Sequence, residues 1–547
     1  ARIEVYGGRI HRSYGGSSER GNIRYEASSA YEEVGSCPMI IDQTYGGGKN
    51  AETDADIRTD MDCVDYTDEL YGGSTNGDVN SNIVLNITNG TFGKVFGGNK
   101  VHGRILGSIT VNVKETGCKP IIIDKLYIGG DQADYSIYGY SGAGNETART
   151  KEEYDALLDK TGITVQKDPR LNIISATRIN NVYGGGFEAR VVGSPHINVN
   201  MEEGTLLAKY MHPEYLTADQ TETRIPGTTV KWRCRENPEV VELGHDGILP
   251  IGTIGNIYGG GDQALVDGST TIEIGTGKHR NEEGEEEVLD PARSAAYITG
   301  RVYGGGNLGD VSGNATIEMG NGYVYDRIYG GGKEGHVGTI STRNDAGKPT
   351  AFAENTGKTT VTISGGHVGP FEYSHLTVDE ARAKVTITPM FMQGTGADGV
   401  AGPDDYGYVF GGGRGELVNP ATDPDINNKT YVNETEVTIK NGYADGHEGD
   451  AEHITSRPLI AGGVYGGSEN GRVLTDTHVN IQGGQIGLGD AKTTAYAESA
   501  FIDPTTTTVT DENKLAECAA WPYGIDTNDD GKKDTWLPYD EHAGDAK

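Results

Sequence analysis

One short pattern recurs along most of this chain: an aromatic residue followed by glycines and preceded by an apolar residue, or once by Thr44. Its closest copies, such as Tyr45 and Tyr71, recur at a spacing that indicates a repeat architecture whose units bury apolar residues only against their neighbours. Longer gaps, such as the one from Tyr183 to Tyr258, approach multiples of the unit, and other gaps require insertions. The aromatic residues are Tyr6, Tyr45, Tyr71, Phe96, Tyr127, Tyr183, Tyr258, Tyr303, Tyr329, Phe410 and Tyr465.

Two apolar columns keep a fixed offset from this aromatic residue. Eight residues after it stands Val79, Val191, Val266, Val311, Val337, Val418 or Val473, with Ile105 displaced by one. Fourteen residues after it begins an alternating apolar pair, as in Leu85/Ile87, Ile197/Val199, Ile272/Ile274, Ile317/Met319 and Val479/Ile481. Polar residues separate the members of each pair, and a period of two is typical of a half-buried strand.

Glycines mark the corners between these strands. Gly77, Gly309, Gly335 and Gly471 lie six residues after an aromatic residue, and Asn-Gly or Gly-Gly follows the apolar pair at Gly90, Gly322, Gly366 and Gly484. We expect these glycines to supply positive φ values. The chain is therefore predicted to be all-β: a parallel β-helix, or β-solenoid, with three short strands per coil of about 25 residues. The aromatic column then either packs as a stack or forms an exposed stripe that grips sugar rings.

The solenoid is predicted to cover residues 1–490, and residues 491–547 read as a C-terminal cap or linker. Insertions are expected near residues 51–68, 133–170, 205–245, 276–297, 340–357 and 370–405. A capping box at Thr150 and Glu153 predicts a helix from Lys151 to Lys160. The charged stretch from Lys278 to Ser294 is predicted to be a solvated loop, and the aspartates from Asp54 to Asp68 are predicted to form either a solvated loop or a cation site.

Charge and cysteine content restrict the partners of this chain. The 46 basic and 80 acidic residues leave a net charge of -34, which excludes nucleic acid and anionic lipid as partners and favours cations. No run of residues is apolar and long enough to span a membrane. The five cysteines show neither a zinc-site nor a disulfide spacing. Because the chain opens inside a repeat, we interpret it as a part of a longer protein.

The most specific short motif lies near the C-terminus, where the chain reads D-x-N-x-D-G-x-x-D from Asp526 to Asp534. It resembles the calcium loops of EF-hands, dockerins and thrombospondin type 3 repeats. The resemblance implies a calcium cofactor, although Leu537 stands where an EF-hand has a bidentate carboxylate. The implied ligands are the side chains of Asp526, Asn528, Asp530 and Asp534 and the carbonyl of Lys532.

Catalytic patterns are weaker. A cluster of carboxylates on successive coils would place acidic residues at one repeat position, but the position four after the aromatic residue is mixed. Asp131 and Asp262 share a Gly-Gly-Asp-Gln-Ala stretch that reads as common turn chemistry in units far apart in the stack. His447 and His453 lack the spacing of a helical zinc pair. The sequons, including Asn86 and Asn89, read as strand and turn ladders. We predict no enzyme and no catalytic residue.

Tyr-Gly-Gly-Gly stretches begin at Tyr183, Tyr258, Tyr303 and Tyr329, and with them most of residues 1–490 resembles large glycine-rich, adhesin-like β-solenoid proteins of bacterial cell surfaces. The resemblance implies an extracellular, cell-surface location and a role as a segment of an adhesin, filament or stalk. Its partners would be a surface glycan, a protein ligand, or neighbouring modules in a self-assembling array. Two alternatives stay open: a carbohydrate-active or carbohydrate-binding β-helix protein, and a trimeric phage fibre.

Overall fold

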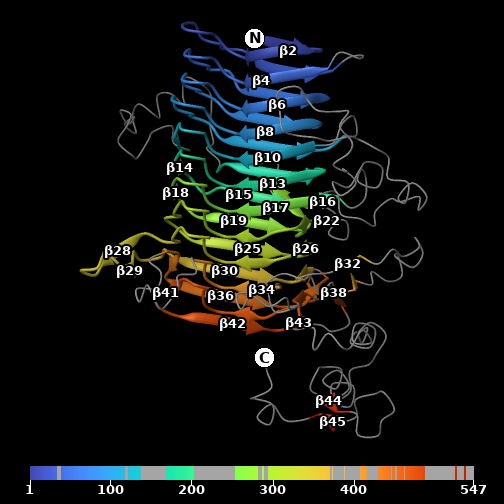
Figure 1. Ribbon diagram of the computed structural model, residues 1–547, viewed down its shortest axis with the longest axis vertical. Coiled ribbons are helices and arrows are strands. Elements are labelled where there is room, and N and C mark those ends of the chain that lie inside the picture. Colours follow the sequence, from blue (N-terminus) through green and yellow to red (C-terminus); the bar gives the residue numbers. More distant parts are fainter. Residues whose placement is uncertain are drawn as a thin grey trace, which may run out of the picture.

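The structure is a computed structural model and describes seventeen segments of the chain. Its named elements are all strands, and no helix in the described segments is long and apolar enough to cross a membrane. The strands stack as successive coils from the N-terminus downward (Figure 1), which confirms the predicted all-β parallel solenoid. The described residues are 1–33, 38–116, 121–136, 168–202, 253–280, 286–288, 294–369, 372–373, 387–388, 407–415, 429–444, 446–449, 453–456, 458–460, 462–486, 524–525 and 535–536.

The first sheet contains twelve parallel strands, one from each coil. They carry the predicted alternating pairs, and in β7 the residues Ile83, Leu85 and Ile87 are buried while Val84 and Asn86 between them are not. In order, the strands are β1 (Arg2–Val5), β3 (Ala27–Glu32), β5 (Ile57–Asp62), β7 (Ile83–Ile87), β9 (Ile109–Lys114), β12 (Arg170–Ser175), β15 (His196–Val199), β19 (Thr270–Ile274), β25 (Ala315–Met319), β30 (Lys358–Ile363), β36 (Glu434–Ile439) and β42 (Thr477–Ile481).

The second sheet holds the aromatic column, because the aromatic residue is the last residue of its strand. Its first seven strands are β2 (Gly8–Tyr14), β4 (Met39–Tyr45), β6 (Val64–Tyr71), β8 (Gly90–Phe96), β10 (Ile121–Tyr127), β13 (Arg178–Tyr183) and β17 (Thr253–Tyr258). Below β17 each strand divides into two short pieces. One row is β23 (Tyr297–Ile298), β26 (Tyr323–Val324), β31 (His367–Val368), β39 (Leu459–Ile460) and β43 (Gln485–Ile486). The other row is β24 (Val302–Tyr303), β27 (Arg327–Tyr329), β34 (Tyr408–Phe410) and β40 (Val464–Tyr465).

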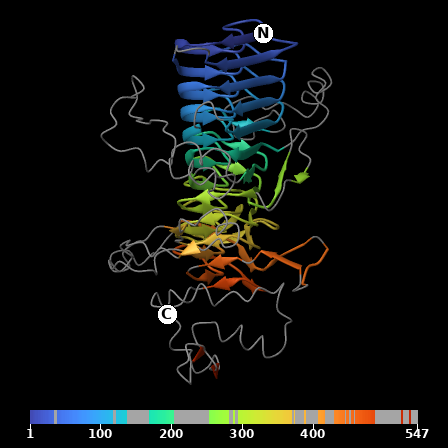
Figure 2. The same cartoon turned by 90° about the vertical axis from the view of Figure 1, so that its right-hand side faces the viewer.

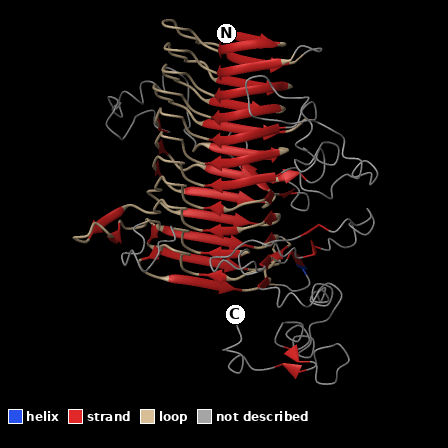
Figure 3. Cartoon of the chain, viewed as in Figure 1, coloured by secondary structure: helices blue, strands red, loops and turns tan. Residues whose placement is uncertain are grey.

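The third side of the coil has fewer and shorter strands than predicted. Its strands are only two residues long, namely β11 (Tyr135–Ser136), β14 (Val191–Val192), β18 (Val266–Asp267), β35 (Tyr431–Val432) and β41 (Arg472–Val473). Elsewhere a single bridge joins successive coils, as between Val266 and Val311, and this side is mostly loop in Figure 3. The predicted valine column is confirmed at these positions. Val418, however, lies outside the described residues, and Val432 is the residue that pairs with Val473.

One continuous hydrophobic core fills the coil from Ala27 to Ile460. Val266, Val311 and Val337 occupy equivalent places in it and are fully buried. Each buried aliphatic side chain contributes about 1.5 to 3 kcal/mol relative to exposure in water. A single coil cannot offset its own ordering entropy with so few apolar groups, so the stacked coils seen from the side in Figure 2 depend on one another.

Strand register corrects the interpretation of the long gaps. Tyr183 pairs directly with Tyr258, and Tyr127 pairs directly with Tyr183. The stretch between Tyr183 and Tyr258 is thus one coil with a long insertion, not several coils. The physical reason is that loop closure costs only about 0.6 kcal/mol for each doubling of loop length, so a coil tolerates a long excursion. Asp131 and Asp262 are therefore only two coils apart, and the prediction that they lie far apart is wrong.

Glycines at the corners serve two different purposes. Gly90 and Gly322 adopt φ values of 124° and 103°, as predicted for the corner that follows the apolar pair. Gly77 and Gly309 are different, because a Cβ atom on either would lie 2.1 Å from the backbone oxygen of the corner in the preceding coil. At those two positions the close stacking of backbones, and not a positive φ, requires glycine.

Several predicted insertions can be compared with the structure. Residues 51–68 are not an insertion: they contain β5 and most of β6, and Asp60 and Asp62 alternate with inward-facing residues of β5. The charged stretch from Lys278 includes an antiparallel hairpin of β20 (Lys278–Arg280) and β21 (Glu286–Val288). Residues 340–357 include the projecting hairpin of β28 (Ile340–Arg343) and β29 (Pro349–Phe352), visible in Figure 1.

Three further short antiparallel pairs leave the coils, and the last of them lies at residues 442–456, where no insertion was predicted. These are β16 (Met201–Glu202) with β22 (Ser294–Ala295), β32 (Glu372–Tyr373) with β33 (Ile387–Thr388), and β37 (Gly442–Tyr443) with β38 (Ile454–Ser456). The predicted helix at 151–160 and the predicted insertion at 205–245 lie outside the described residues. Near the C-terminus, β44 (Gly524–Ile525) pairs with β45 (Thr535–Trp536).

Candidate functional site: a polar seam beside the aromatic stack

Eleven aromatic rings form one continuous stack along the second sheet. Neighbouring ring centroids lie 4.6 to 5.2 Å apart and their planes differ by 2 to 12°. The rings from Tyr45 to Phe410 are buried in a cluster separate from the main core. The packing interpretation is therefore confirmed for these coils, and the exposed stripe is wrong. The first ring is Tyr14, preceded by Ser13, whereas Tyr6 is 53% exposed and outside the stack.

Three tyrosine hydroxyls of this stack bond to acidic side chains of later corners. Each acid stands four residues after the aromatic residue that lies two coils further on. Tyr71 donates to Asp131 at 3.1 Å, Tyr127 donates to Asp262 at 3.0 Å, and Tyr329 donates to Glu469. The corner position that looked mixed in sequence is thus one wall of a polar seam. The opposite wall is the column two residues before the aromatic residue.

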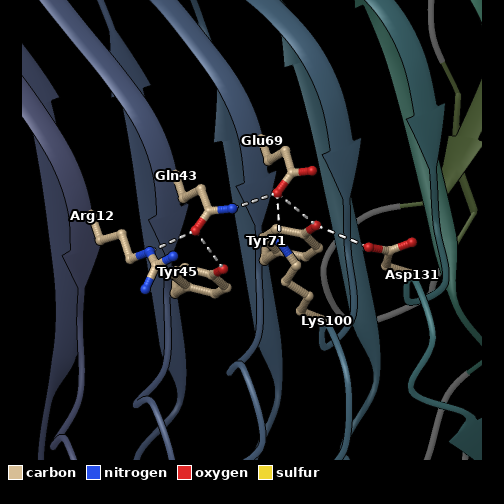
Figure 4. Close-up of polar contacts among 7 residues, drawn as sticks. All are labelled: Arg12, Gln43, Tyr45, Glu69, Tyr71, Lys100 and Asp131. Carbon is tan, nitrogen blue, oxygen red and sulfur yellow. Dashed lines mark hydrogen bonds and ion pairs between the residues drawn. The ribbon is translucent and has the colours of Figure 1, made fainter.

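Glu69 is the centre of the first part of this seam (Figure 4). Its Oε2 atom accepts from the Gln43 amide at 2.8 Å and from the Lys100 ammonium at 2.6 Å, and lies 3.2 Å from the Tyr71 hydroxyl. That hydroxyl also lies within hydrogen-bonding distance of Asp131, so two carboxylates flank a single proton donor. Gln43 continues the network by accepting from Arg12 at 2.9 Å.

The two carboxylates around Tyr71 have opposite pKa shifts. Burial raises the pKa of Asp131 above its ordinary value. Burial also opposes ionisation of Glu69, but the hydrogen bond and the positive charge of Lys100 outweigh it and lower the pKa of Glu69. Two carboxyl groups whose environments separate their pKa values are the arrangement that divides the roles of general acid and general base.

Three coils of the seam form a compact group that we call the lysine seam. Glu69, Lys94 and Lys125 are cross-strand neighbours on the second sheet. The facing corners carry Asp131, Phe187 and Asp262 and stack in that order, because Glu188 donates to the Asp131 carbonyl and Gln263 donates to the Phe187 carbonyl. Lys100 reaches the same group from an earlier corner, with its ammonium 5.1 Å from the centroid of the Tyr71 ring.

A second group further along the stack, the arginine seam, consists of Arg301, Asp326, Arg327, Tyr408 and Glu469. Asp326 is 8% exposed and pairs with Arg301, while Arg327 lies 3.7 Å from Asp326 and 3.8 Å from Glu469. The guanidinium of Arg327 also lies over the Tyr408 ring at 5.7 Å. These groups neutralise one another in place.

The residues predicted for the calcium loop, Asp526, Asn528, Asp530, Lys532 and Asp534, lie outside the described residues, between β44 and β45. In the described segments no group of three or more metal-ligating side chains is found. His447 and His453, which sequence spacing separated, have stacked rings with centroids 3.8 Å apart.

The predicted polar ladder is confirmed at two sequons. The Asn86 amide donates to Asp60 at 2.7 Å and its oxygen accepts from Asn112 at 2.9 Å, while Asn89 is fully buried. Cys63 is disulfide-bonded, a pairing that cysteine spacing did not predict.

Sequence reasoning also missed the column that holds Glu69, Lys94 and Lys125. The available signal was its constant offset, two residues before each aromatic residue.

Comparisons with known proteins give no family for this chain: no protein-family model matches it, and searches of curated proteins and of solved structures find no match either.

Proposed function

We propose that this chain is a rigid structural or adhesive module of an extracellular bacterial surface protein, a segment of an adhesin, filament or stalk. The observation that carries the proposal is the unbroken parallel pairing of the first sheet from β1 to β42, accompanied by eleven stacked rings. At about 4.8 Å per spacing, the eleven spacings between the twelve strands of this sheet extend for on the order of 50 Å. Insertions that leave this rod at its corners would offer contact surfaces to a partner.

Two features support the extracellular location. The disulfide at Cys63 suits an oxidising compartment, where such bonds persist. The acidic charge of -34 keeps the chain soluble and discourages binding to nucleic acid.

Electron microscopy of the purified chain tests the rod. We expect unbranched particles that are longer than they are wide, with the long axis along the stacked coils. Separate compact lobes would contradict the proposal. A reducing-end assay on a panel of polysaccharides tests the absence of catalysis, because release of products would replace the structural role with an enzymatic one.

A second candidate function is a carbohydrate-binding or carbohydrate-active β-helix. The specific observation in its favour is the Tyr71 hydroxyl between Glu69 and Asp131, with the two pKa values shifted in opposite directions. Carboxylates that flank a hydroxyl bind sugar hydroxyls well, and such a pair can also divide acid and base roles. Binding without product release would assign a binding function to this seam.

Calcium binding at the C-terminal loop is a separate part of the proposal. We expect calorimetric titration of the chain to lose one calcium site when Asp526 and Asp530 are both replaced by alanine. An unchanged number of sites would overturn the assignment.

A further inference from the structure

Lys94 and Lys125 are adjacent lysines on neighbouring parallel strands of the lysine seam. Like charges in this position repel each other. Lys125 lies 3.8 Å from Asp262, and among the described residues no salt bridge involves Lys94. Asp131 lies within the electrostatic field of Lys94 but forms no ion pair with it, so the two ammonium groups are only partly paired and can take up an external anionic group.

The corner wall that faces these lysines carries an aromatic ring, Phe187. The Lys94 and Lys125 ammonium groups are 5.7 and 5.9 Å from the centroid of the Phe187 ring. Phe187 is partly exposed and packs edge-on against Tyr127, with ring centroids 6.1 Å apart. It is the apolar member of a corner column in which Asp131 precedes it and Asp262 follows it.

The aromatic stack also changes at this point, because the ring that faces the apolar corner is a phenylalanine and not a tyrosine. By the two-coil offset that joins Tyr71 to Asp131 and Tyr127 to Asp262, the corner opposite Phe96 is Phe187. Phe96 has no hydroxyl to satisfy, so an apolar corner leaves no buried donor unpaired. Phe187 is therefore a partly exposed ring with the Asp131 and Asp262 corners on its two sides, and Lys94 and Lys125 face it.

We propose that the lysine seam binds an acidic polysaccharide, with the carboxylate of a uronate residue held by Lys94 and Lys125 and its sugar ring on Phe187. The long lysine stems allow both ammonium groups to leave the ring face for the ligand carboxylate. Glu69 and Asp131, which are partly exposed, accept hydrogen bonds from sugar hydroxyls, whereas Asp262 is buried and stays bonded to Tyr127 and Asn307. The inference rests on the second candidate function and is independent of the rod, because a rod needs no ligand at this seam.

Calorimetric titration of the full chain with an oligogalacturonate tests the inference, in a buffer with EDTA so that calcium does not bridge protein and ligand. We expect saturable binding that weakens as salt is added. Lys94→Gln should weaken binding about tenfold, the equivalent of about 1.4 kcal/mol for one lost ion pair. Phe187→Leu should weaken it by a similar factor through loss of the flat ring.

Three controls keep the test specific. Lys94→Arg should retain the affinity, and Lys333→Gln, which removes a lysine from the corner column of another coil, four residues after Tyr329, should not change it. A neutral galactose oligomer of equal length should bind at least about tenfold more weakly than the uronate. Absence of binding by the parent chain, equal binding by Lys94→Gln, or equal binding of the neutral oligomer would each overturn the inference. None of these results affects the rod seen by microscopy.

Discussion

The lysine seam and the arginine seam are built on the same backbone pattern but differ in how completely their charges are paired. In both, a tyrosine hydroxyl donates to an acid from a corner two coils further on. In the arginine seam Arg327 approaches two acids, and its side chain is 15% exposed. In the lysine seam Lys125 is 32% exposed and adjoins Lys94.

This difference shows that the solenoid fixes where side chains meet but not what they do there. Guanidinium groups bind carboxylates with a planar fork and so complete a rigid network within the protein. Lysines are flexible point charges that remain available to a ligand. One seam therefore holds coils together, and the other is the one at which we propose a ligand.

The largest expected effect contrasts the central cations of the two seams. Arg327→Met keeps the apolar stem but leaves Asp326 and Glu469 without this partner, and we expect a loss of about 3 kcal/mol of unfolding free energy. Lys94→Met should change stability by less than about 0.5 kcal/mol, because it relieves repulsion with Lys125. Urea unfolding measures both. Equal losses in the two variants would remove the distinction between the seams.

An intermediate effect tests the two-coil offset. Phe96→Tyr adds a buried hydroxyl that faces Phe187 and finds no acceptor, so we expect a cost of about 1 to 2 kcal/mol. Adding Phe187→Asp should recover much of this cost by restoring the pairing seen between Tyr71 and Asp131. The single Phe187→Asp variant is the control for the cycle. A double variant no more stable than the sum of the two single changes would contradict the offset.

The smallest effect concerns pH in the lysine seam. Because burial raises the pKa of Asp131, its contribution to stability is present below the ordinary carboxyl value and is lost as pH rises through the raised value. The pKa of Glu69 is lowered, so its contribution is present above the ordinary value and is lost as pH falls through the lowered value.

Asp131→Asn should therefore gain stability relative to the parent chain as pH rises, and Glu69→Gln should lose it. Each change should stay below about 1.4 kcal/mol, the value of one pKa unit, because both groups keep contact with water. Denaturant unfolding between about pH 3 and about pH 8 measures the two trends. Parallel trends for the two variants would show that the pKa shifts are not opposed.

The candidate site was only partly accessible to sequence reasoning. Asp131 and Asp262 were recognisable by their shared local sequence, but their distance in the stack was misjudged. The gap from Tyr183 to Tyr258 does not reveal how much chain leaves the coil as an insertion, because long loops cost little free energy. Glu69 and Lys94 escaped notice because surface positions of a strand carry no constraint on residue type.

The sequence by itself determined the coil: alternation places every second residue inside, and a constant offset from each aromatic residue aligns Val266 with Val311. These properties follow from covalent strand geometry, which any single repeat contains. Only the tertiary structure decided that the rings are buried and that the hydroxyls of Tyr71, Tyr127 and Tyr329 meet corners two coils away. The two-coil offset between a hydroxyl and its acid depends on the direction in which side chains extend past the neighbouring coils, and no single repeat specifies that direction.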